Sequence, residues 1–99
     1  MNMQALMKQA QALQKDMLKA KEEVDNTEFI GESALVKITV MGTKEVKSIE
    51  ISKDADISGD DLEMLEDMLL VAINDAMKKV DAETEKKLGK FNSMLPGGF

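Results

Sequence analysis

The most hydrophobic run of the chain is Met64-Leu65-Glu66-Asp67-Met68-Leu69-Leu70-Val71-Ala72-Ile73-Asn74-Asp75-Ala76. Apolar residues recur here every three or four positions, which places them on one face of a helix. This apolar stripe comprises Leu62, Leu65, Leu69, Ala72, Ile73, Ala76 and Val80. Ser58 or Asp60 can cap the helix, each with an acid three residues later. The sequence therefore predicts a core helix that begins after Ser58-Gly59 and stops near Gly89.

Upstream of this helix, the apolar residues follow the two-residue period of β-strands. The expected strand positions are Phe29 and Ile30, then Val36, Ile38 and Val40, and then Val46, Ile49 and Ile51. A break in parity after Val46 predicts a bulge in the third strand. We expect connections at Gly31-Glu32-Ser33-Ala34 and at Met41-Gly42-Thr43-Lys44, where Gly42 is able to take positive φ. The prediction is a three-stranded antiparallel meander with one face left to cover.

Residues 2–25 have a second helical pattern, uninterrupted by Gly or Pro. Their apolar residues form a heptad seam, which comprises Met3, Leu6, Ala10, Leu13, Met17, Ala20 and Val24. Such a helix is about 35 Å long, which exceeds the length that a core of this size can cover. Either another helix runs beside it or part of it protrudes. The seam can pack against the second helix, a neighbouring protomer, or both.

Composition excludes several classes of function. The chain has 99 residues, enough for one domain, and contains neither Cys nor His. Catalysis by Ser-His or Cys-His pairs and almost every zinc site therefore lack their residues. Asp54 to Gly59 imitate the start of a calcium-binding loop, but Leu65 stands where a bidentate Glu is required. We expect a soluble intracellular protein that is not an enzyme, with no cofactor, metal, membrane partner or small-molecule substrate.

Charge is distributed unevenly along the chain. The net charge is −6, with thirteen basic residues, all lysine, against nineteen acidic ones. Residues 1–21 contain four lysines and only Asp16 as an acid, whereas residues 54–75 contain eight acids and no base. A negative net charge disfavours binding to nucleic acid, yet the local electrostatic field at the first helix is positive.

Lysines and amides lie opposite the heptad seam of the first helix. Lys8 and Lys15 occupy the f position, Lys19 the c position, and Gln4 and Gln11 the b position. On a protruding helix these groups can reach phosphates, with little base specificity because lysine lacks a planar fork. A solubilising face explains the same pattern.

Several segments resemble the YbaB/EbfC nucleoid-associated proteins. These are the hydrophobic run quoted above, the Met/Gln/Lys-rich first helix, Val36-Lys37-Ile38-Thr39-Val40-Met41-Gly42, and Met94-Leu95-Pro96-Gly97-Gly98. The match covers nearly the whole chain, in order. The resemblance implies a helix–three strands–helix fold, a tweezer-like homodimer with protruding helical arms, and DNA binding with little sequence preference.

We therefore expect an α+β homodimer that binds double-stranded DNA in the cytoplasmic nucleoid, with effects on nucleoid organisation and gene expression. Residues 1–90 would form a single domain and residues 91–99 a flexible tail. The expected DNA-contacting residues are Lys8, Lys15, Lys19, Lys86, Lys87 and Lys90. The alternative is a dimeric protein-interaction adaptor with weak or no DNA binding. The negative net charge favours this alternative.

Overall fold

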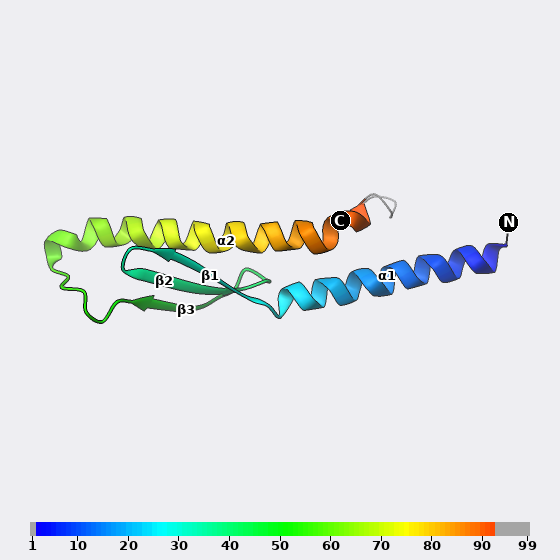
Figure 1. Ribbon diagram of the computed structural model, residues 1–99, viewed down its shortest axis with the longest axis horizontal. Coiled ribbons are helices and arrows are strands. Elements are labelled where there is room, and N and C mark those ends of the chain that lie inside the picture. Colours follow the sequence, from blue (N-terminus) through cyan, green and yellow to red (C-terminus); the bar gives the residue numbers. More distant parts are fainter. Residues whose placement is uncertain (1, 93–99) are drawn as a thin grey trace.

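The computed structural model describes residues 2–92, which form an α+β rod (Figure 1). The elements are α1 (Met3–Asp25), β1 (Glu28–Ser33), β2 (Val36–Met41), β3 (Val46–Ile51), the 3-10 turn η1 (Gly59–Asp61) and α2 (Leu62–Asn92). The rod measures 71 × 19 × 14 Å, with a radius of gyration of 19.6 Å. A compact chain of this length has a radius of about 13 Å. The predicted order of helix, three-stranded antiparallel sheet and helix is confirmed.

The core lies between α2 and one face of the sheet. Strand order is β1-β2-β3, with antiparallel pairs throughout. The central strand β2 presents Val36, Ile38 and Val40 to Ala72, Ala76 and Val80 of α2, and all six side chains are buried. The predicted helical stripe is therefore the core stripe, except that Leu62 at its start is exposed.

A glycine allows β1 to approach α2 closely. A Cβ atom on Gly31 would lie 2.0 Å from the carbonyl oxygen of Ala72 and 2.8 Å from Cβ of Ala76. Our prediction that Gly31 begins a connection is wrong, because β1 continues to Ser33 and the turn falls at Ala34 and Leu35. Gly31 is needed for close packing within a strand and not for a turn.

The second connection confirms one prediction and corrects another. Thr39 pairs with Ser48 but Val40 pairs with Val46, so Lys47 is the extra residue of the predicted bulge. Positive φ falls on Lys44, at 75°, and not on Gly42. Gly42 instead touches the end of α1, where an added Cβ would lie 1.8 Å from the Val24 carbonyl oxygen.

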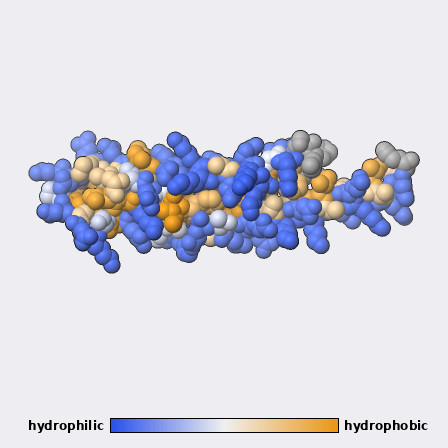
Figure 2. All heavy atoms as spheres, in the orientation of Figure 1, coloured by the Kyte–Doolittle hydropathy of each residue, from blue (hydrophilic) through white to orange (hydrophobic). Residues whose placement is uncertain are grey.

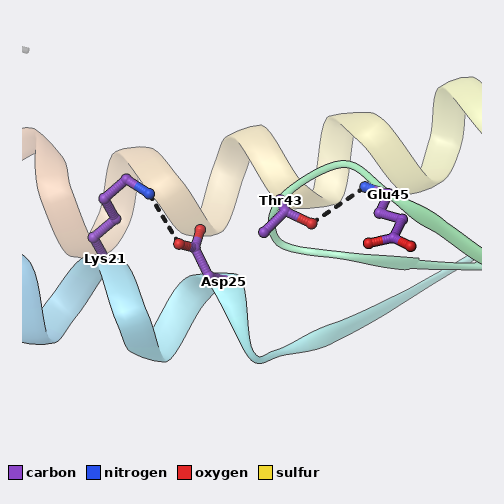
Figure 3. Close-up of polar contacts among 4 residues, drawn as sticks. All are labelled: Lys21, Asp25, Thr43 and Glu45. Atoms are coloured by element: carbon purple, nitrogen blue, oxygen red, sulfur yellow. Dashed lines mark hydrogen bonds and ion pairs between the residues drawn. The ribbon is translucent and has the colours of Figure 1, made fainter.

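The base of α1 lies beside this connection (Figure 3). In the last turn of α1, Lys21 pairs with Asp25 at 2.9 Å. Within the connection between β2 and β3, the Glu45 N–H donates to the Thr43 hydroxyl at 3.4 Å. The Gly42 N–H also donates to the carbonyl oxygen of Thr27, at 3.0 Å, just after α1. The hairpin connection thereby holds the C-terminal end of α1.

The other end of α1 protrudes beyond α2 (Figure 1). Burial of the seam falls toward the N-terminus: Val24 is buried, Met17 is half-buried, and Met3 is 73% exposed. The heptad seam therefore packs against α2 over only part of its length.

α2 is longer than predicted. It passes through Gly89 to Asn92, so the predicted stop at Gly89 is wrong. Leu88 and Phe91 are buried in the part of α2 that runs beside α1, and this packing offsets the weak helix propensity of glycine (Figure 1). Phe91 and Asn92, the first residues of the expected tail, belong to the helix, and residues 93–99 lie outside the described part of the chain.

At the start of α2, η1 carries one of the two predicted caps. The backbone N–H of Ser58 donates to Asp61 Oδ2 at 2.9 Å, and its hydroxyl donates to the same oxygen at 3.1 Å. Ser58 and Asp61 thus form a capping box, which satisfies backbone groups at the helix entrance.

Candidate nucleic-acid interface

We define the arm as α1 together with residues 81–92 of α2, and the hub as residues 28–80, which comprise the sheet, the loop after it and the first part of α2. The predicted lysines Lys8, Lys15 and Lys19 lie along α1 in the arm and are exposed. None of the three pairs with a carboxylate among residues 2–92. Their charges are therefore available to an external anion.

The predicted lysines of α2 differ from one another. Lys86 is exposed and makes no ion pair with the described residues. Lys87 pairs with Glu23 of α1, with 3.4 Å between Nζ and Oε2, so its charge is partly neutralised. The ammonium group of Lys90 lies 5.2 Å from the centre of the Phe91 ring, within range of a cation–π contact.

Lys86 lies on the opposite side of the arm from the lysines of α1. Thr84 and Leu88 mark the side of α2 that faces α1, because both are shielded in the two-helix segment. Lys86 is two residues from each, and at about 100° per residue it points away from α1. Lys8 and Lys15 likewise lie opposite the seam of α1. The structure therefore does not bring Lys86 into one patch with Lys8 and Lys15. Heptad positions describe each helix separately, so they could not predict how the two helices face each other.

Lysines of the hub and of the base of the arm are mostly engaged with carboxylates. Lys44 pairs with Asp81 at 2.9 Å, and Lys47 pairs with Glu28. These exposed pairs contribute little stability. They do reduce the positive field around the hub relative to that along the outer side of α1.

Two neighbouring groups stabilise the ionised form of Asp75 in α2. Its Oδ2 accepts a hydrogen bond from the Glu32 backbone N–H at 3.2 Å, and Lys79 lies 3.3 Å away. The bond from Glu32 and, next, the ammonium group of Lys79 hold the pKa of Asp75 below its usual value. Lys79 also donates to the Ile30 carbonyl oxygen at 2.6 Å. Asp75 and Lys79 thus fasten one flank of α2 to β1.

The acidic block lies at the end of the rod opposite the N-terminus (Figure 1). Its members in the loop and the first turns of α2 are Asp54, Asp56, Asp60, Asp61, Glu63, Glu66 and Asp67. Within residues 2–92, no group of three or more acidic side chains is arranged to hold a metal ion. No helix in the described part of the chain has the length and apolarity to cross a membrane.

The fold and the charge distribution together define a small α+β protein with a lysine-bearing helical arm and an acidic hub. The chain belongs to the YbaB/EbfC DNA-binding family, whose model matches residues 1–95. This is a family of nucleoid-associated DNA-binding proteins and not a known enzyme family. The resemblance given by the sequence motifs is confirmed.

Individual relatives agree with this assignment. The chain is 48% identical over 98 residues to a nucleoid-associated protein of Lactococcus lactis, covering 97% of this chain and 98% of the relative. A nucleoid-associated protein of Enterococcus faecalis is 43% identical, with 97% and 93% covered. The crystal structure of an uncharacterized protein from Helicobacter pylori superposes with a TM-score of 0.72 at 21% identity, over 96% of this chain and 99% of that one. This last similarity shows a shared fold.

Proposed function

We propose that the chain binds double-stranded DNA through its phosphates, largely without sequence specificity, as a tweezer-like homodimer. It would act within the cytoplasmic nucleoid and so influence nucleoid organisation and gene expression. Family membership and the nucleoid-associated relatives support DNA as the partner.

One observation carries the proposal: Lys8, Lys15 and Lys19 follow one another along the exposed outer side of α1, unpaired with any described carboxylate. Lysine offers a point charge and no planar fork to read base edges, so it favours phosphate contacts. Lys86, Lys87 and Lys90 of α2 supply secondary contacts, with Lys86 on the other side of the arm. The acidic end of the hub faces away from the duplex, because like charges repel.

Salt dependence tests this proposal directly. Three α1 lysines in each of two protomers give six phosphate contacts, so affinity should fall about 10³-fold between 50 and 200 mM salt. Gel-shift titrations on two duplexes of unrelated sequence should give similar affinities at each salt concentration. Binding that ignores salt, or that strongly prefers one sequence, would contradict the proposal.

A matched pair of variants tests the assigned surface. Lys8→Gln with Lys15→Gln and Lys19→Gln should weaken binding at least about tenfold and flatten the salt dependence. The control, Lys44→Gln with Lys47→Gln and Lys78→Gln, removes the same net charge from exposed positions outside α1. Equal losses in the two variants would show that net charge, and not the α1 surface, governs binding.

A second candidate is a dimeric adaptor that binds another protein. The net charge of −6 and the acidic end of the hub favour it. Affinity capture from lysate with and without nuclease separates the two functions, since associations bridged by DNA disappear after digestion. Under the DNA-binding proposal, most captured proteins are lost with the DNA.

A further inference from the structure

The apolar seam of α1 extends beyond the part that α2 covers. Val24 is buried and Met17 is half-buried, whereas Leu6 is 44% exposed and Met3 is 73% exposed. We call the exposed stretch of the seam, which comprises Met3, Leu6 and Ala10, the open seam. In Figure 2, hydrophobic residues interrupt the hydrophilic surface along this protruding part of α1. Because an apolar stripe with helical spacing is stabilised by packing on another segment, the open seam indicates a contact surface.

The end of α2 is directed toward the open seam. Lys87 of α2 pairs with Glu23 of α1 at 3.4 Å, and the two helices run in opposite directions (Figure 1). Asn92 follows Lys87 by five residues, so it is level with about residue 18 of α1. From that level, Met3 is about 22 Å further along α1. The chain after Asn92 therefore starts beside the covered part of the seam and is directed toward its open part.

Residues 93–99 have the length and the sequence for this path. An extended chain advances about 3.1 Å per residue, so these seven residues span about 22 Å. Pro96 cannot continue α2, and it favours an extended backbone at Leu95. Gly97 and Gly98 have no side chain, so their backbone is able to approach the surface of a helix closely. The segment can therefore follow the seam from the end of α2 to the tip of α1.

The side chains of this segment match the open seam in polarity. Residues 93–99 include Met94, Leu95 and Phe99 and no charged side chain. In an extended path, Leu95 comes level with about residue 12 of α1 and Phe99 with about residue 4. These are the levels at which Ala10 and Met3 leave the seam open, so apolar side chains of the segment coincide with apolar positions of α1.

We propose that residues 93–99 pack along the open seam of the same chain. Leu95 lies against Ala10, and Phe99 lies against Met3. The contact goes beyond the proposed function, since it requires neither DNA nor a second copy of the chain. The α1 lysines assigned to DNA lie away from the seam, so the segment leaves them accessible.

A segment of the same chain fits the open seam better than a second copy does. Leu88 and Phe91 of α2 are buried where α2 runs beside α1, and residues 93–99 continue this contact without a break. The covalent link gives the segment an effective concentration on the order of 1 mM, which exceeds that of a second copy in dilute solution. Because so short a segment detaches locally, it covers the seam while adding little to the free energy of global unfolding.

Paired cysteines in the full-length chain test the contact, because the chain has none of its own. In glutathione buffers, Ale10 is replaced together with Leu95: Ala10→Cys with Leu95→Cys should form an intrachain disulfide at least about tenfold more favourably than Ala12→Cys with Leu95→Cys. Ala12 is an exposed alanine like Ala10, but it lies about 160° around α1 from it. Equal values for the two variants would overturn the contact. Disulfide-linked dimers in place of intrachain links, on non-reducing electrophoresis, would overturn it in favour of a second copy.

Fluorescence gives an independent measurement, since the chain contains neither Trp nor Tyr. The indole of Phe99→Trp should emit at shorter wavelength, and be quenched less by acrylamide, than an indole free in water. Adding Ala10→Glu should abolish both effects, because docking would bring apolar side chains onto a charge. Adding Ala12→Glu should preserve them. An indole in Phe99→Trp that is as exposed as free indole, or an equal response to the two Glu substitutions, would overturn the contact.

Discussion

The two long helices have similar periodicity and opposite environments. In α2, Ala72, Ala76 and Val80 are buried on the sheet, and Leu88 and Phe91 are buried beside α1. In α1, Val24 is the only buried residue of the helix. Amphipathic spacing predicted both helices, and the greater hydrophobicity of the α2 run identified α2 as the helix that the chain itself covers. α2 takes its stability from packing, whereas the first half of α1 depends on its own helix propensity.

The largest expected difference between the core beneath α2 and the protruding part of α1 is in how much a buried side chain contributes to the free energy of unfolding. Ile38→Ala removes a fully buried side chain beneath α2 and should cost about 2–5 kcal/mol of unfolding free energy. Leu6→Ala, on the protruding part of α1, should change it by less than about 0.5 kcal/mol. Urea unfolding of both variants measures the contrast. Comparable costs would mean that the N-terminal half of α1 is covered in solution.

The attachment of α1 gives a smaller effect. Gly42→Ala places a Cβ atom against the Val24 carbonyl, so the hairpin and the helix end must separate, at a cost of about 1–3 kcal/mol. Trypsin should then cleave α1 faster than in the wild type, with α2 still protected. Gly59→Ala is the control, because nothing lies within 4 Å of its added Cβ. Unchanged cleavage of the Gly42 variant would refute this role for the glycine.

The smallest effect concerns the flank of α2 fastened to β1. The pKa of Asp75 is lower in the folded chain than its usual value of 3.8, so its ionised form stabilises the fold above about pH 4. This contribution is lost as pH falls through the lowered pKa. Asp75→Asn should therefore reduce Tm at neutral pH and make little difference near pH 2.

Asp67→Asn, at an exposed position of the same helix, serves as the control for Asp75→Asn. Thermal scans at both pH values provide the measurement. A Tm difference between the Asp75 variant and the wild type that persists unchanged at the acidic pH would show that the carboxylate charge is not the cause.

Sequence patterns predicted those elements whose local signals agree with the final packing. The alternation in β2 and the apolar stripe of α2 were sufficient to place the core. Glycines were less informative, since Gly31, Gly42 and Gly89 do not share the turn or helix-stop role that sequence alone suggests for glycine. Two of them are set by the approach of another backbone, and such approaches leave no local signature. No sequence signal predicts the positive φ of Ala34 and Lys44 either.

The candidate interface was predictable only in part. Heptad position alone predicted that Lys8, Lys15 and Lys19 face outward. The pairing of Lys87 with Glu23 joins residues 64 positions apart, which no local pattern can indicate. The side of the arm on which Lys86 lies also depends on which face of α2 meets α1.

The separation of charge along a 71 Å rod affects how the protein approaches a polyanion. With lysines toward one tip and carboxylates crowded at the other, the molecule is a long electric dipole, and the field of a polyanion exerts a torque on it. Rotation during diffusion would turn the cationic tip forward before any contact forms. An acidic isoelectric point is then compatible with rapid capture, because orientation, and not total charge, decides which collisions succeed.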